Sequence, residues 1–86
     1  MNINELIAIV KNKLQAEIVI QDIKIEDKSF LHKNLKGHQE GKYHLKLTIN
    51  SDELGKINKI ASTKRIYNIL DLELKEHIHS IQILLN

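Results

Sequence analysis

Five histidines are the side chains in this sequence most able to do chemistry, and the chain contains no cysteine. A neutral imidazole nitrogen is a common metal ligand, whereas the missing thiols leave no thiolate ligand within this chain. No two of the histidines are four residues apart, which is the helical spacing of a zinc-binding pair, so a dedicated zinc site is not expected. The five positions are His32, His38, His44, His77 and His79.

Ser29 lies close to His32 in sequence, an arrangement that superficially suggests a nucleophile with its base. The chain lacks the other parts of such a site, because it has no nucleophile elbow, no glycine-rich phosphate loop and no pair of carboxylates in an apolar segment. Asp27 and Ser29 are instead expected to organise a turn through hydrogen bonds from side chain to backbone. The sequence therefore predicts a protein that is not an enzyme.

The charge pattern gives little support for a nucleic-acid partner. Thirteen basic residues are interleaved with eleven acidic ones, for a net charge of +2. A basic cluster does occur at Lys56, Lys59, Lys64 and Arg65, and it could contact phosphate or an acidic partner surface. The Gly-x-x-Gly loop by which KH domains clamp nucleotides is absent. Because of the basic cluster, nucleic-acid binding is kept as an alternative function, but it is not the main prediction.

The elements that position these residues follow from hydrophobic periodicity. Apolar residues recur every three or four positions in the first segment, which predicts a helix capped by Asn2 with Glu5 in its first turn. The inward positions of this helix are Ile3, Leu6, Ile7, Val10 and Leu14. A second helical region, a short turn at 52–54 and a helix ending near Lys75, is expected to bury Ile60, Tyr67, Leu70 and Leu74, with Ile66 and Ile69 in support.

Three segments are predicted to be strands. Residues 18–26 are rich in β-branched side chains, and a change of phase at 21–22 indicates a bulge or bend. Residues 43–50 alternate between apolar and polar side chains, which places His44 on the solvent face. Residues 78–85 form a short, mostly apolar final strand, and the polar residues 27–41 form a long connection between the first two strands.

These elements predict an α+β fold of the αββααβ kind. The first two strands can pair antiparallel, and the helical region is long enough for a crossover to a parallel third strand. The result is a three-stranded mixed sheet with the helices packed on one face. A chain of 86 residues is expected to be one domain, residues 1–86, and a cytoplasmic protein, since we see no secretory signal or apolar stretch of membrane-spanning length.

An ordered set of short motifs resembles the BolA-like protein family. Residues 27–32 match an acidic-x-Ser-x-x-His start of a loop, and residues 42–46 match the polar-Tyr-His-Leu-Lys start of the next strand. Residues 65–67 match a basic, aliphatic and Tyr triplet, while residues 73–74 and 78–81 resemble the closing Glu-Leu and aliphatic-His-small-aliphatic signature. The chain departs from the family where Arg-His-Arg usually precedes the aliphatic-Tyr pair, and where Lys56 replaces a usual glycine.

The resemblance implies a fold similar to class II KH domains and a non-enzymatic adaptor function. It implies a monothiol glutaredoxin as partner, with a [2Fe–2S] cluster bridging the two proteins, and with missing thiolates supplied by the partner and a small thiol such as glutathione. The closing histidine carries over to His79 as a cluster ligand, and the loop histidine to His32, with His38 as its rival. His77 could lie beside His79. Lys64, Arg65 and His44 are expected near the partner or nucleic-acid surface.

Overall fold

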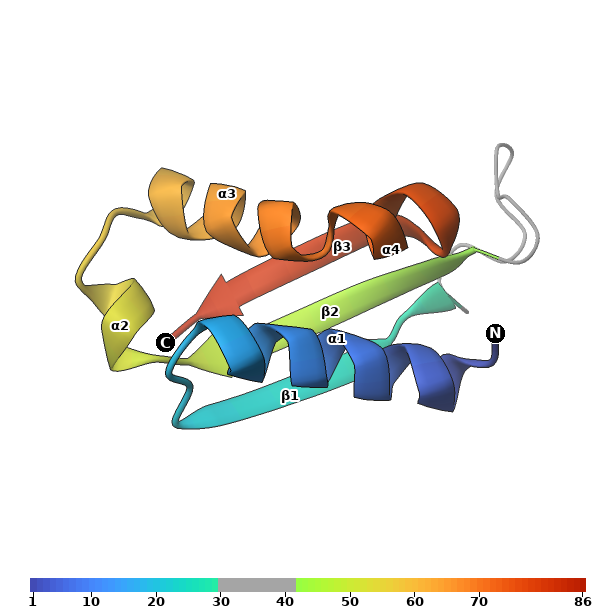
Figure 1. Cartoon of the computed structure of the whole chain (residues 1–86), viewed down its shortest axis with the longest axis horizontal. Coiled ribbons are helices and arrows are strands. Elements are labelled where there is room, and N and C mark those ends of the chain that lie inside the picture. Colours follow the sequence, from blue (N-terminus) through green and yellow to red (C-terminus); the bar gives the residue numbers. More distant parts are fainter. Residues whose placement is uncertain (30–41) are drawn as a thin grey trace.

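The computed structural model describes residues 1–29 and 42–86 (Figure 1). In this part of the chain the elements follow the predicted order of helix, two strands, helices and a final strand. Their bounds are α1 Ile3–Glu17, β1 Asp22–Asp27, β2 Tyr43–Asn50, α2 Asp52–Gly55, α3 Lys59–Ile69, α4 Asp71–Glu76 and β3 Ile78–Leu85. None of the helices in these residues is long and apolar enough to span a membrane.

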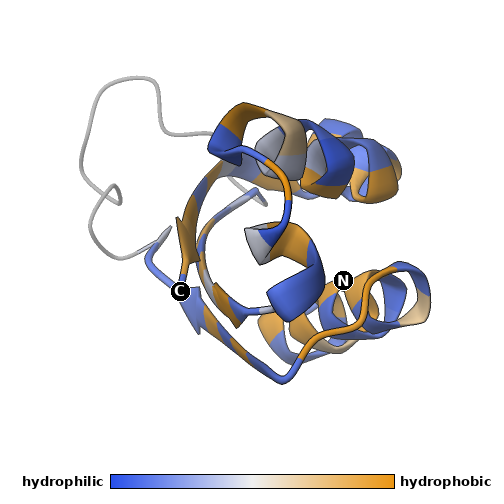
Figure 2. Ribbon diagram, turned by 90° about the vertical axis from the view of Figure 1, so that its left-hand side faces the viewer, coloured by the Kyte–Doolittle hydropathy of each residue, from blue (hydrophilic) through white to orange (hydrophobic). Residues whose placement is uncertain are grey.

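The three described strands form one mixed sheet in the order β1-β2-β3. β2 pairs antiparallel with β1, with Ile25 opposite Leu47, and parallel with β3, with Leu47 opposite Ile83. The helices cover one face of this sheet (Figure 2), so the molecule has two layers. The mixed sheet and the packing of the helices on one face confirm the α+β fold predicted from the sequence.

The core lies between the helices and β2. Alternate residues of β2 point towards the helices because successive side chains of a strand face opposite ways. They meet the inward stripe of α1 and two residues near the end of α3. The core residues at this interface are Leu6, Val10, Leu14, Leu45, Leu47, Ile49, Ile66 and Leu70, all between 0 and 2% exposed. The predicted inward face of the first helix is therefore confirmed at its centre.

Polar side chains begin three of the helices. The Oδ1 of Asn2 accepts the Glu5 N–H at 2.8 Å, as the sequence predicts for α1. Ser51 Oγ accepts the Leu54 N–H at 3.2 Å, and Asn58 Oδ1 accepts the Ala61 N–H at 2.8 Å. Each bond satisfies an amide that the first turn of a helix leaves without a partner, which stabilises the helix by about 1 kcal/mol.

The boundary between the first helix and the first strand differs from the prediction. The strand was expected at 18–26, but α1 continues to Glu17 and β1 begins only at Asp22. The β-branched Ile18 has extended backbone and ends the helix, with its N–H bonded to the Leu14 carbonyl at 2.9 Å. Residues 18–21 are therefore a connection, and the chain bends at Gln21, where the change of phase predicted a bulge or bend.

The second helical region also differs. The helix expected to continue to about Lys75 is broken at Leu70, between α3 and α4. Ile66 and Leu70 are buried as predicted, but Ile60 is 71% exposed and Tyr67 is 42% exposed. The buried stripe of α3 instead includes Ser62, whose hydroxyl donates to the Leu54 carbonyl at 3.1 Å. The stripe is turned away from the predicted one, so Ile60 and Tyr67 face solvent.

Candidate functional site

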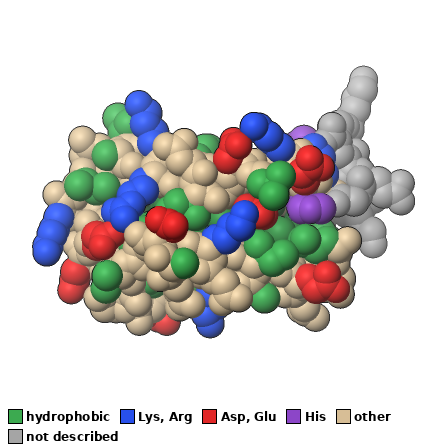
Figure 3. Space-filling view, in the orientation of Figure 1, with side chains coloured by type: hydrophobic (Ala, Val, Ile, Leu, Met, Phe, Trp, Pro, Cys, Tyr) green, Lys and Arg blue, Asp and Glu red, His purple; other side chains and the backbone are tan. Residues whose placement is uncertain are grey.

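A β-bulge places His79 at the surface where β3 begins. Tyr43 of β2 pairs with Ile78, but the next residue, His44, pairs with Ser80, so His79 is the extra residue on β3. Bulges re-aim side chains and are common beside functional sites. The His79 side chain is exposed, and histidine side chains reach the surface at this end of the molecule (Figure 3). The geometry makes His79 accessible to a second protein.

His44 lies directly beside His79. The centroids of the two imidazole rings are 4.8 Å apart, with an angle of 58° between the ring planes. His44 Nδ1 is 2.6 Å from Ser80 Oγ, the hydroxyl of the residue that the bulge brings opposite it. The expectation that His44 is exposed is wrong, because it is only 5% exposed. The shifted register packs the His79 ring and Ser80 against it.

A turn at the end of β1 supports the backbone of His44. Asp27 Oδ1 accepts the Ser29 N–H at 2.9 Å, which confirms the turn-forming role predicted for these two residues. Ser29 Oγ accepts the His44 N–H at 3.0 Å, and the His44 carbonyl accepts the Lys28 N–H at 2.7 Å. The hydroxyl of Ser29 is thus bonded to the strand backbone, in the manner of a structural residue.

The remaining histidines are not brought to this site by the described structure. His32 and His38, the two candidates for the loop ligand, lie outside the described residues. His77 ends α4, where its N–H donates to the Glu73 carbonyl at 2.8 Å and its own carbonyl accepts the Tyr43 N–H at 2.9 Å. Within residues 1–29 and 42–86, no three His, Cys, Asp or Glu side chains gather as a metal site.

The two basic residues expected at a partner surface have different environments. Arg65 donates from Nη2 to the Glu17 carbonyl at 2.7 Å, and its Nη1 lies 2.6 Å from Glu53 Oε2. These contacts connect α3 with α1 and α2, which gives Arg65 a structural role. Lys64 is exposed. A place for either residue in a partner surface remains a prediction.

Two charged groups add to the electrostatics of the fold. Burial acts to raise the pKa of Glu26, but Lys24, Lys28 and Lys46 together outweigh it and hold the pKa below its ordinary value of 4.5. Glu73 on α4 is 4% exposed, and its Oε2 accepts a 2.7 Å hydrogen bond from Lys13 Nζ of α1. This ion pair fixes α4 to α1 immediately before the strand that carries His79.

Sequence reasoning missed the contribution of Ser80 to the site. The residue belongs to the closing motif at 78–81, but nothing in its local pattern indicates that it meets His44, 36 positions earlier. Glu73 was likewise noted only as part of a motif, with no role. The available signal was its place among the apolar residues of a helix, where a carboxylate is almost never buried without a partner.

Comparison with known proteins gives consistent results. The model of the BolA-like protein family matches residues 14–86. The DNA-binding transcriptional regulator BolA of Haemophilus influenzae is 33% identical over 73 residues, which are 85% of this chain and 68% of that protein. The BolA domain of SufE1 from Arabidopsis thaliana has a TM-score of 0.77 at 26% identity, covering 100% of this chain and 93% of that one. BolA1 from the same plant has a TM-score of 0.76 at 26% identity, covering 92% and 87%.

Proposed function

Because this chain belongs to the BolA-like protein family, we propose that it is a non-enzymatic adaptor that binds a monothiol glutaredoxin and co-ligates a bridging [2Fe–2S] cluster. In this role it would act in iron–sulfur cluster trafficking or iron homeostasis. The observation that carries the proposal is the bulge at His79, which exposes one imidazole at the end of a strand. A ligand for a shared cluster must be both accessible to the partner and held by its own fold.

The side chains present suit such a cluster. His79 is the first ligand, and the second is a histidine of the connection, His32 in preference to His38. The glutaredoxin and a small thiol such as glutathione would provide the thiolates that this cysteine-free chain lacks. When bound, the cluster supplies one-electron redox chemistry, at a potential that imidazole ligands raise. The His44 ring packs against the His79 ring, and the Ser80 hydroxyl contacts His44 in turn. Such neighbours commonly orient the ligands of a metal site.

Reconstitution with iron and sulfide tests the proposal. A monothiol glutaredoxin is reconstituted with and without this protein in the presence of glutathione, and visible absorption and circular dichroism are recorded. We expect a distinct spectrum in the presence of the adaptor, and we expect His79→Ala to abolish it. His77→Ala is the matched control, because that histidine lies only two residues away at the end of α4.

The same experiment separates the two loop candidates. His32→Ala should alter the spectrum and His38→Ala should not, while both variants should retain the secondary structure of the wild type. Spectra unchanged by adding the protein, or unaffected by His79→Ala, would contradict cluster sharing.

DNA binding is the second candidate function. It is favoured by the printed name of the Haemophilus influenzae relative, a DNA-binding transcriptional regulator. In this chain, exposed Lys56, Lys59 and Lys64 lie at the α2–α3 connection and on α3, where a KH-like fold meets nucleic acid. Fluorescence anisotropy with labelled DNA duplexes over a range of salt concentrations tests this function, because phosphate contacts make affinity fall steeply with salt. A flat response at low salt would exclude it.

A further inference from the structure

β3 forms an edge of the sheet within the described part of the chain, since β2 is its one strand neighbour there. The Asn86 N–H donates to the Ile49 carbonyl of β2. By the alternation of a strand, the N–H and C=O groups of Ile81, Ile83 and Leu85 point away from β2 towards the outer edge. Natural edges are commonly protected by lysine, proline or a bulge, but residues 80–85 contain no lysine or proline and the bulge lies before them.

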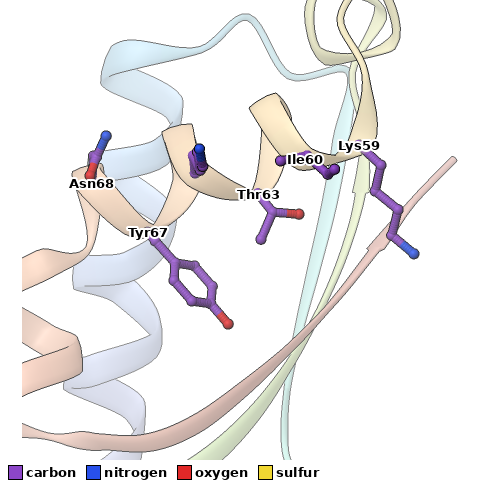
Figure 4. Close-up of a pocket in the computed structure, with 6 residues that line it drawn as sticks. Lys59, Ile60, Thr63, Tyr67 and Asn68 are labelled. Carbon is purple, nitrogen blue, oxygen red and sulfur yellow. The ribbon is translucent and has the colours of Figure 1, made fainter.

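One flank of α3 overhangs this edge. Arg65 reaches α1, which places its flank on the inner side of the helix. The opposite flank borders an open groove of about 690 Å³ whose lining residues all belong to α3: Lys59, Ile60, Thr63, Lys64, Tyr67 and Asn68. Figure 4 shows Lys59, Thr63 and Tyr67 projecting from the same side of the helix. Ile60 and Tyr67 on this flank are exposed, although the sequence predicts that both are buried.

The groove approaches the strand at Lys59. A second hollow of about 310 Å³ is lined by Lys59 and Ser62 of α3 and by Ile83, Leu84 and Leu85 of β3, among others. Lys59 therefore borders both spaces. An extended segment paired with the outer edge of β3 would place alternate side chains under α3, against Ile60 and Tyr67.

The charges select the occupant. No Asp or Glu lines either space, and none of the ion pairs formed by the described residues involves Lys59 or Lys64. A second copy of this chain would bring the same lysines together across a symmetric edge, and the repulsion opposes that arrangement. Nucleic acid would satisfy the lysines but not the carbonyls of the edge or the exposed apolar side chains.

We propose that the outer edge of β3 and the overhanging flank of α3 bind an extended acidic segment of a partner protein as an added strand. Apolar side chains of the segment fill the groove beside Ile60 and Tyr67, and its carboxylates pair with Lys59 and Lys64. The site lies along the second half of β3 and on α3, away from the bulge that carries His79. The proposal goes beyond the cluster-sharing function and does not rest on it.

Synthetic peptides test the proposal on the full chain without any cluster. The probe is a fluorescein-labelled nine-residue peptide that alternates valine and glutamate, and its binding is followed by fluorescence anisotropy. One control peptide carries lysine in place of glutamate, and a second carries N-methyl groups on alternate amides, which cannot donate to a strand edge. We expect binding of the first peptide alone, with shifts in the NMR amide signals of Ile81, Ile83 and Leu85.

Charge variants locate the contact. Lys64→Glu should weaken binding about fivefold, as expected for reversing an exposed charge contact. Lys11→Glu is the matched control, an equal charge change at an exposed position of α1, and it should leave the affinity unchanged. Equal binding of the N-methylated or lysine peptide, or no binding of the glutamate peptide, would overturn the proposal. The proposal would also be overturned if the amide signals of Ile81, Ile83 and Leu85 shifted only on addition of a DNA oligonucleotide, or only on self-association of the protein, and not with the glutamate peptide.

Discussion

Replacing Ser80 with alanine should loosen the buried imidazole beside the candidate ligand. The substitution removes the hydroxyl that lies 2.6 Å from His44 Nδ1, and His44 is only 5% exposed. Leaving a buried polar atom without its partner costs about 1–3 kcal/mol. Since Ser80 itself is exposed, water can partly replace its hydroxyl. We therefore expect the lower end of that range, about 1 kcal/mol, which corresponds to a fall in Tm of about 5 °C for a chain of this size.

Thermal unfolding and NMR of the imidazole nitrogens measure this effect. In Ser80→Ala the ¹⁵N resonance of His44 Nδ1 should move, because its hydrogen-bond partner has changed, while the Tm falls. Gln82→Ala is the matched control, an exposed residue two positions along the same face of β3. An unchanged Tm together with an unchanged His44 Nδ1 resonance would refute the argument that the hydroxyl holds the ring. Ser80→Thr, which keeps the hydroxyl, should retain the wild-type resonance.

Further substitutions test the electrostatics and the core. Lys13→Met should lower the free energy of unfolding in urea by about 2 kcal/mol, because it leaves the buried Glu73 carboxylate without its cation. Adding Glu73→Leu should recover most of that loss, and a double variant no more stable than Lys13→Met would contradict this. Leu47→Ala removes a fully buried side chain from the central strand and should cost about 3 kcal/mol in the same assay. The pKa of Glu26 is held below its ordinary value of 4.5, so its charge stabilises the fold above that pH and the contribution is lost as the pH falls through the folded-state pKa. Glu26→Gln should therefore lose less stability than the wild type on acidification below pH 4.5, as measured by Tm.

The second and third strands could be predicted from the sequence, including the residues at which they begin and end. Residues 43–50 and 78–85 alternate or form a short apolar run, and their periods are local properties of the chain. The helical region after Gly55 was harder, because counting apolar positions assumes a continuous helix whose apolar side chains all face inwards. The break at Leu70 violates the first assumption, and the exposure of Ile60 and Tyr67 violates the second. Ser62 is buried because the Leu54 carbonyl accepts its hydroxyl, a contact that the period does not reveal.

The candidate site could be predicted from the sequence only in part, for a similar reason. His79 was correctly placed at the start of a strand, but the exposure of His44 was predicted from alternation within its own strand. Its burial depends on the register between β2 and β3, which the bulge shifts by one residue. Pairing across 36 positions decides which side chain meets His44, and a local pattern contains no information on that choice.

The bulge separates two candidate binding sites on β3. The extra residue at His79 exposes one side chain at the beginning of the strand, while pairing with β2 is regular from Ser80 onwards. A cluster bound at the start of β3 would use the His79 imidazole. A peptide strand added to the outer edge would use backbone amides instead. Substitutions at well-separated sites with no shared partners have additive effects. His79→Ala should therefore leave binding of the acidic peptide unchanged, and a loss of peptide affinity in this variant would show that the two surfaces are coupled.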